Sequence, residues 1–151
     1  MITKEQFLKQ TSQINKNFKT RNWINNEDRW LYHEQSIKWI EELKPSKILE
    51  IGGLGIKLHE NSDTLDYEKS GWLVNKDWTY NQDINEELDI PHYDMIIALR
   101  VYHHSKDFNK NFKEVRKHCD ALILALPKEF PIIEPATQTV ECKDSNIYLW
   151  K

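Results

Sequence analysis

The sequence has little cysteine, no long apolar run and no excess of basic residues, and each absence removes a class of protein. Its two cysteines, Cys119 and Cys142, lie far apart and form no CxxC pair, so neither a disulfide framework nor a structural zinc site is expected. The longest apolar run, from Ala121 to Pro127, is far shorter than the roughly 20 residues that span a membrane. The net charge of −3 gives no basic footprint for nucleic acid or anionic lipid.

These features predict a cytoplasmic protein with reduced thiols, and the N-terminus lacks the apolar stretch of a signal peptide. The length of 151 residues favours one domain, with helices over residues 1–45 and a sheet-based core over residues 46–151. A small molecule is the expected partner, rather than nucleic acid or a membrane. The oligomeric state stays open.

Helical patterns occupy the first third of the chain. A capping-box match at Thr3 and Gln6 predicts the start of a first helix. A second helix is expected over Glu27 to Leu43, where apolar residues recur with a near-helical period until Pro45 ends it. This second helix should pack on a sheet.

After Lys47 the pattern changes to short apolar runs. They predict strands at Ile48–Ile51, Thr64–Tyr67, Trp78–Asn81, Tyr93–Leu99 and Ala121–Leu126, with a helix at Asp107–His118 before the last of them. This order predicts an α/β parallel sheet with both faces covered. The segments Thr137–Cys142 and Ile147–Trp150 predict an antiparallel hairpin whose last strand lies inside the sheet.

The stretch after the first strand favours a ligand site. Glu50 lies at the strand end, and three glycines follow it, at positions 52, 53 and 55, where they allow a ligand to approach the backbone. Asp66 closes the second strand, where a carboxylate can accept both ribose hydroxyls of a nucleoside, and Asp83 could meet an adenine amino group. A dinucleotide fingerprint would need glycine at Leu58, and no phosphate-loop motif occurs.

These segments carry a family resemblance. ILEIGGLG, TLDYE, QDINEELDIPHYDMIIALRVYHHSKDF and KEVRKHCDALILALP resemble the class I S-adenosylmethionine-dependent methyltransferases of the small-molecule type (type 11/12-like), in abbreviated form, over roughly residues 47–127. The resemblance implies a Rossmann-like, doubly wound, mostly parallel sheet with a C-terminal antiparallel hairpin, and S-adenosylmethionine as cofactor. It assigns cofactor binding to Glu50, Gly52, Gly53, Gly55, Asp66, Asp83, Ile84 and Leu99. One departure is that only residues 56–63 separate Gly55 from the second strand, so the first crossover helix is expected to be reduced or absent.

The expected reaction is transfer of a methyl group to an O or N nucleophile of a small molecule. His104, just after the fourth strand, is the candidate base, because an imidazole can accept a proton at neutral pH. Substrate contacts are expected from Arg100, His103, Trp30 and His33, with Trp23 as a further aromatic residue before the first strand.

Several alternatives stay open. His104 could instead cap the following helix, Arg100 could form a surface ion pair, and the aromatic residues could be core. A metal at His103 and His104 is disfavoured, since adjacent side chains on an extended chain point to opposite sides. The chain could also be a non-catalytic or regulatory module of the same fold, or another enzyme that uses S-adenosylmethionine.

Overall fold

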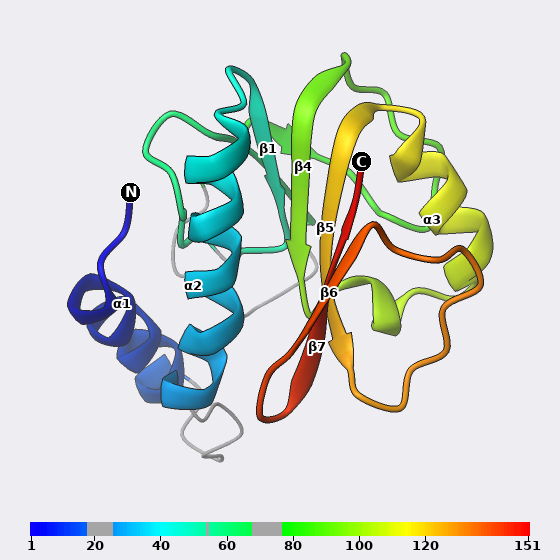
Figure 1. Ribbon diagram of the computed structural model, residues 1–151. Helices are drawn as coiled ribbons and strands as arrows, with labels where there is room; N and C mark the ends of the chain where they lie inside the picture. Colours follow the sequence, from blue (N-terminus) through cyan, green and yellow to red (C-terminus); the bar gives the residue numbers. More distant parts are fainter. Residues whose placement is uncertain (18–25, 54, 68–76) are drawn as a thin grey trace.

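A computed structural model describes residues 1–17, 26–53, 55–67 and 77–151 of the chain (Figure 1). Its helices are α1 (Lys4–Asn17), α2 (Asn26–Leu43) and α3 (Phe108–Arg116), with a short 3-10 helix η1 (Tyr102–His104). Its strands are β1 (Ile48–Ile51), β2 (Asp63–Asp66), β3 (Tyr80–Asn81), β4 (Tyr93–Leu99), β5 (Cys119–Pro127), β6 (Gln138–Glu141) and β7 (Ser145–Trp150). Trp23 lies outside the described residues.

The strands form one sheet in the order β3-β2-β1-β4-β5-β7-β6. The first five are mutually parallel, while β7 runs antiparallel to both β5 and β6. This confirms the Rossmann-like α/β fold, including the C-terminal hairpin whose last strand is interior. The order follows from the apolar runs, because β4 and β5 are buried on both faces and so must lie in the middle of the sheet.

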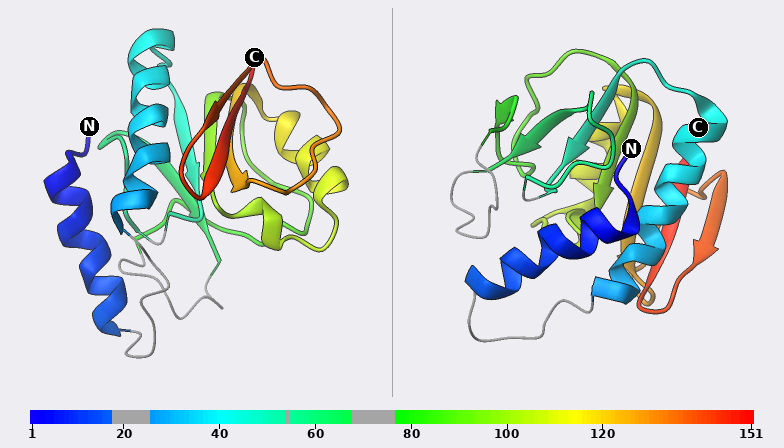
Figure 2. Two further views of the ribbon diagram at one scale, coloured as in Figure 1. Left: turned by 60° about the horizontal axis from the view of Figure 1, so that its bottom comes forward. Right: turned by 90° about the vertical axis from the view of Figure 1, so that its left-hand side faces the viewer.

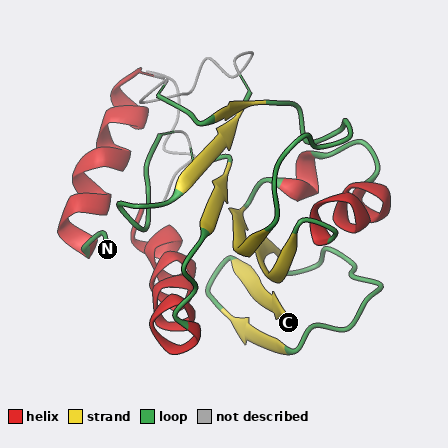
Figure 3. Cartoon of the chain, turned by 90° about the horizontal axis from the view of Figure 1, so that it is seen from above, coloured by secondary structure: helices red, strands yellow, loops and turns green. Residues whose placement is uncertain are grey.

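Helices cover both faces of the sheet. Figures 2 and 3 show α2 against one face, with α1 packed on its outer side, and α3 against the other face. On the α2 side, the core includes Tyr32, Trp39 and Ile97, and on the α3 side it includes Phe112 and Trp150. The sheet is therefore covered by a layer of helix on each face.

The predicted helix boundaries are close to those observed. The capping box is confirmed, because Gln6 Oε1 accepts from the Thr3 amide at 2.9 Å and Thr3 Oγ1 accepts from the Gln6 amide at 3.2 Å. Helix α3 ends at Arg116 rather than His118. The amides of residues 117 and 118 bond to carbonyls three residues earlier, so the last residues form a tighter turn.

The predicted strands β2 and β3 need correction. Strand β2 lies one residue earlier than predicted, and β3 comprises two residues instead of four. Before β3, the side-chain hydroxyls of Thr64 and Thr79 each accept the other residue's amide, at 3.0 and 3.2 Å. The Thr79 amide also donates to the Thr64 carbonyl at 2.9 Å, so these side-chain bonds accompany the backbone pairing just before the strand, which begins at Tyr80.

The connection from β1 to β2 contains no helix among its described residues, 52, 53 and 55–62, which confirms a reduced first crossover. Both cysteines are free thiols, as predicted, and both are buried. No helix in the described part of the chain has the length and apolar character that crossing a membrane requires.

Candidate functional site

The topology itself marks one place for a ligand. The chain leaves β1 toward β2 and β3 on one side, and then returns to β4 on the other side of β1. In open parallel sheets, ligands bind where the connections diverge in this way, at the carboxyl ends of the two strands. The candidate site is therefore the crevice beyond Ile51 and Leu99.

A cavity of about 70 Å³ lies in this crevice. It is lined by residues of α1, α2, β1, the following loop and β4, namely Phe7, Thr11, Arg29, His33, Glu50, Ile51, Gly52, Gly53, Ile56, Leu58, Ile97 and Leu99. The volume is well below the roughly 300–1,000 Å³ of typical ligand pockets. Residues of α1 and α2 form part of the wall of this cavity. A bound nucleoside would have to displace some of these residues or extend outside the cavity.

The turn after β1 requires glycine for two reasons. Gly52 adopts φ +71°, and a Cβ on it would lie 2.5 Å from Cγ2 of Val101, the second residue after β4. Gly55 also has a positive φ, of 88°. Both values fall in the left-handed region that glycine adopts without cost. The Val101 side chain thus packs directly against the turn at Gly52, where the segment after β4 meets the segment after β1.

Glu50 is buried at the end of β1, and both of its oxygens have partners in the fold. Oε1 accepts from the Leu58 amide at 2.7 Å, and Oε2 accepts from the His59 amide at 3.2 Å. Burial raises the pKa of the Glu50 carboxyl, and these amide donors oppose that shift. Glu50 lines the cavity, but its hydrogen bonds hold the helix-free loop against the sheet.

Asp66 lies beside the glycine turn. Ile51 is in register with Leu65, and the Gly52 amide donates to the Leu65 carbonyl at 2.9 Å, so Asp66 follows next to Gly52. One carboxylate oxygen of Asp66 accepts from the Tyr67 amide at 2.9 Å. The glycine turn and a carboxylate thus meet at adjacent strand tips, as the sequence predicted for a nucleoside site.

Asp83 and Ile84 belong to a loop that is bonded to the segment after β4. Asp83 Oδ1 accepts from the Asn85 amide at 2.9 Å and from Asn85 Nδ2 at 3.0 Å. Asn85 Oδ1 in turn accepts from the Lys106 amide at 2.8 Å. Ile84 packs on the core of the α3 side. Asn85 therefore connects the two loops that flank the predicted adenine position.

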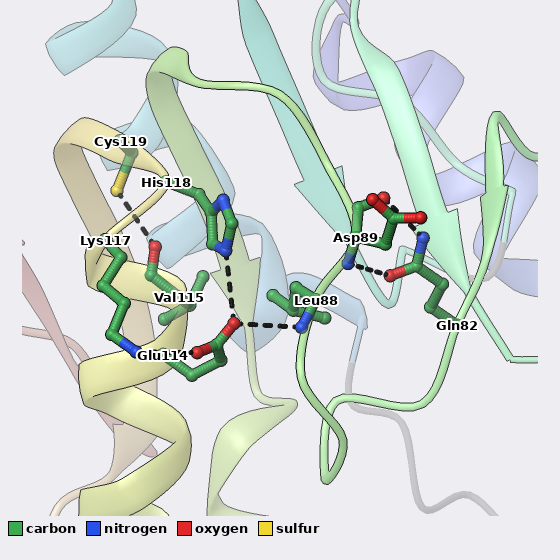
Figure 4. Close-up of polar contacts among 8 residues, drawn as sticks. All are labelled: Gln82, Leu88, Asp89, Glu114, Val115, Lys117, His118 and Cys119. Carbon is green, nitrogen blue, oxygen red and sulfur yellow. Dashed lines mark hydrogen bonds and ion pairs between the residues drawn. The ribbon is translucent and has the colours of Figure 1, made fainter.

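Figure 4 shows how the rest of this loop is held. Gln82 and Asp89 bridge its two ends, since the Asp89 amide donates to Gln82 Oε1 and Gln82 Nε2 donates to the Asp89 carbonyl, both at 2.9 Å. Glu114 of α3 accepts from the Leu88 amide at 3.0 Å and also contacts His118. The bond from the Leu88 amide is the main cause that lowers the pKa of the Glu114 carboxyl. The loop is thus fixed to α3 before any ligand binds.

His103 and His104 lie on η1, where their ring centroids are 3.8 Å apart. The expectation of an extended chain with opposed side chains was therefore wrong, because the 3-10 turn places both rings on one side. His104 is exposed, and Asp107 caps α3 instead of it. His103 Nδ1 is buried without a hydrogen-bond partner among the described residues, and burial lowers the pKa of this imidazole to about 4. No group of three or more potential metal ligands occurs in the described ranges.

Helix α2 contributes His33 to the cavity wall. His33 Nδ1 donates to the Arg29 carbonyl at 2.7 Å, since a carbonyl can only accept, and this leaves the lone pair of the neutral ring on Nε2. Burial lowers the pKa of His33 to about 4. Trp30 is buried against Phe7, with ring centroids 5.4 Å apart, and it is not among the described residues that line the cavity.

Arg100 points toward the hairpin turn. Its Nη1 donates to Ser145 Oγ at 3.2 Å and to the Asp144 carbonyl at 3.4 Å, and its backbone adopts φ +63°. The side chain thereby connects the end of β4 to the turn between β6 and β7. A substrate anion would have to compete with these contacts.

The cavity brings together Glu50, Gly52, Gly53, Leu99 and His33 from the sequence-predicted set, with Asp66 adjacent. Sequence reasoning missed Phe7, Thr11 and Arg29, which also line it. Phe7 and Thr11 lie about one and two helical turns after Thr3, the first residue of the capping box. The predicted helix start could therefore have placed them on one face of this helix. The sequence holds no signal that would single out Arg29, because it is one of many charged residues that precede β1.

No family model matches the chain, and no curated protein matches its sequence. Solved structures do match in fold. The N-methyltransferase NodS from Bradyrhizobium japonicum WM9, solved with S-adenosyl-L-homocysteine, gives a TM-score of 0.54 at 15% identity over 79% of this chain and 71% of that chain. Monomeric WbdD gives 0.54 at 17% identity over 87% and 42% of the two chains. The plantazolicin methyltransferase BpumL, solved with a substrate analogue and S-adenosyl-L-homocysteine, gives 0.51 at 18% identity over 78% and 52%. These likenesses establish the fold, and the chain spans about half the length of two of these neighbours.

Proposed function

We propose that this chain binds S-adenosylmethionine and transfers its methyl group to an O or N nucleophile of a small molecule. The observation that carries the proposal is that the Gly52 turn, which lines the crevice at the switch point, lies beside Asp66 at the end of the neighbouring strand β2. The fold neighbours NodS and BpumL support it, because both were solved with S-adenosyl-L-homocysteine.

The residues at the crevice are of chemical types that can bind an adenosyl group. Gly52 and Gly53 line the crevice, although Val101 and the Ile56 carbonyl fill the positions that Cβ atoms would take on them. Asp66 would supply a carboxylate for the ribose hydroxyls. The Asp83–Ile84 turn offers a carboxylate and an apolar surface for the adenine ring, and Asn85 holds this turn beside the segment after β4. Leu99, at the end of β4, also lines the crevice. Bound there, the cofactor would supply an activated methyl group on a sulfonium.

The protein's own part in such a transfer is alignment and proton removal. His104 is our candidate for the proton acceptor, because it is exposed on the turn that follows β4. His33, His103, Trp30 and Arg100 remain candidates for contacts with the acceptor molecule. Of these, His33 has the strongest position, since it lines the cavity as a neutral ring with a free lone pair.

The narrow cavity favours a second candidate function. With about 70 Å³ of space and Glu50 already bonded to the loop, the chain could be a non-catalytic or regulatory module that keeps the fold. Such a module would bind the cofactor weakly or without turnover. Cofactor binding and methyl transfer must therefore be measured separately.

Calorimetric titration with S-adenosylmethionine and with S-adenosyl-L-homocysteine tests the proposal. Asp66→Ala should weaken binding by more than about tenfold, because two charge-assisted hydrogen bonds to the ribose are lost. Asp120→Ala, near the amino end of β5 and so away from the carboxyl ends of the strands, is the control and should bind as the wild type does. Undetectable binding to the wild type would rule out the enzyme, and binding without turnover across a panel of alcohols and amines would favour the module.

A further inference from the structure

A second cavity lies on the α3 side of the sheet, away from the candidate cofactor site. It has a volume of about 540 Å³ and opens between α3 and residues 130–136, which connect β5 to β6 (Figure 1). Its apolar lining consists of Phe108, Phe112, Ile132, Ile133 and Trp150. We refer to it as the α3 groove. Ile133 is 75% exposed, the highest value among the exposed large hydrophobic residues of the described chain.

The walls of the α3 groove are held in place by the fold. Trp150 Nε1 donates to the Glu134 carbonyl at 3.0 Å, which fixes the connecting segment to β7. The Phe112 ring packs on Trp150 with centroids 4.9 Å apart, and Phe108 packs on Phe130 at the same distance. The groove therefore exists before a ligand arrives, and binding would not have to order its walls.

Cations lie along the α3 wall of this groove. Lys113, Arg116 and Lys117 all line it, although the chain as a whole carries a net charge of −3. Arg116 donates to the Cys119 and Asp120 carbonyls, and Lys117 pairs with Glu114 at 3.1 Å. Lys113 is exposed and has no carboxylate partner among the described residues.

Glu134 adds one carboxylate to the lining, on the connecting segment. Two of the three cations are on α3 and Lys117 directly follows it, so one wall of the groove is positive and the rest of its lining is mainly apolar. An occupant that matches both features would carry an apolar body and a single anionic group directed at Lys113.

We propose that the α3 groove binds a small amphipathic anion, such as a carboxylic acid with an aliphatic or aromatic body. The volume falls within the range of about 300–1,000 Å³ that is typical of small-molecule sites. A stable protein interface buries about 800 Å² on each partner. Ile133 is the only large exposed hydrophobic residue of the groove, so its apolar surface is confined to the cavity and suits a small molecule better than a protein.

The test uses decanoate as the anion, decanol as its neutral analogue and the dye 8-anilinonaphthalene-1-sulfonate as a reporter. The wild type should enhance the dye's fluorescence saturably, and decanoate should displace the dye at much lower concentration than decanol does. Saturating S-adenosyl-L-homocysteine should leave the dye signal unchanged, because the two sites share no residue. Absence of saturable dye binding, or equal displacement by decanol, would overturn the proposal.

Substitutions at two exposed positions test the site without removing side chains from the folded core. Ile133→Asp should weaken decanoate binding by more than about tenfold, since it places a carboxylate in the apolar entrance. Lys113→Gln should weaken it by about two- to fivefold and leave decanol binding unchanged. Leu31→Asp and Lys38→Gln on α2 are the matched controls and should bind as the wild type does. Equal binding by Ile133→Asp, with unfolding midpoints unchanged, would place the dye elsewhere and refute the site.

Discussion

The contact between the glycine turn and the segment after β4 gives a prediction that needs no ligand. In Gly52→Ala, the new Cβ would lie 2.5, 3.0 and 3.3 Å from Cγ2, Cγ1 and Cβ of Val101. Alanine at φ +71° also costs about 1–2 kcal/mol in the left-handed region. Forcing extra atoms into a packed site adds about 1–3 kcal/mol. Gly52→Ala should therefore lower the free energy of unfolding by about 2–5 kcal/mol.

A double-mutant cycle separates the two costs. Val101→Ala removes the two methyl groups that meet the new Cβ, so the double variant Gly52→Ala with Val101→Ala keeps the φ cost and loses the steric one. The loss of unfolding free energy in the double variant should be smaller than the sum of the two single losses by about 1–3 kcal/mol. The measurement is urea unfolding of all four proteins, compared at matched m-values.

Gly53→Ala provides the control for this cycle. A Cβ at Gly53 would meet the Ile56 carbonyl oxygen at 2.8 Å, and no Val101 atom is among its near neighbours. Its effect should add to that of Val101→Ala within about 0.5 kcal/mol. If Gly52→Ala and Val101→Ala were also additive, the close approach of the two loops at the switch point would be refuted.

Two further predictions concern side chains around the site. His33 has its pKa lowered to about 4 by burial, from about 6.5 in the unfolded chain, so its contribution to stability is full above pH 6.5 and is lost as the pH falls toward 4. His33→Gln should flatten the fall in the free energy of unfolding over this range, which amounts to about 3 kcal/mol for the wild-type imidazole, and an unchanged slope in urea titrations would contradict the assignment. Asn85→Ala should lower the free energy of unfolding by about 1–3 kcal/mol, because the Lys106 amide and the buried Asn111 side chain lose their acceptor. The exposed Asn109→Ala is its control, and an equally large loss there would remove the role given to Asn85.

The sheet could be predicted from the sequence because its central strands have strongly apolar patterns. The residues of β4 match the predicted range, and β5 extends beyond its predicted range by two residues at the start and one at the end. The edge strand β3 was overestimated, since the bonds that the Thr64 and Thr79 hydroxyls accept from each other's backbone amides leave no trace in hydrophobic periodicity. The other edge strand, β6, lies within the predicted segment Thr137–Cys142, so the two-residue strand β3 is the edge strand that the pattern misjudged.

The site was less predictable than the fold, because its geometry depends on long-range packing. The glycines and Asp66 were recognised from their places at strand ends, and the structure puts them side by side. The turn that aligns His103 with His104 is closed by local backbone bonds, such as the His104 amide to the Val101 carbonyl at 3.1 Å, which hydrophobic periodicity does not reveal. The direction of Arg100 toward the hairpin depends on Ser145, which lies far along the chain. No local pattern encodes such partners.

The absence of a helix from the described residues between β1 and β2 explains why Glu50 is hydrogen-bonded to the loop that follows it. A helix after β1 would satisfy its own backbone amides, whereas an irregular loop must find acceptors elsewhere. Glu50 accepts two of these amides, and the Ile2 amide donates to the Leu58 carbonyl at 2.8 Å, which ties the loop to the N-terminus. Both oxygens of Glu50 are therefore committed to the fold. Under the proposed function, the hydrogen bonds to the ribose would therefore come from Asp66 at the tip of β2 rather than from Glu50 at the end of β1.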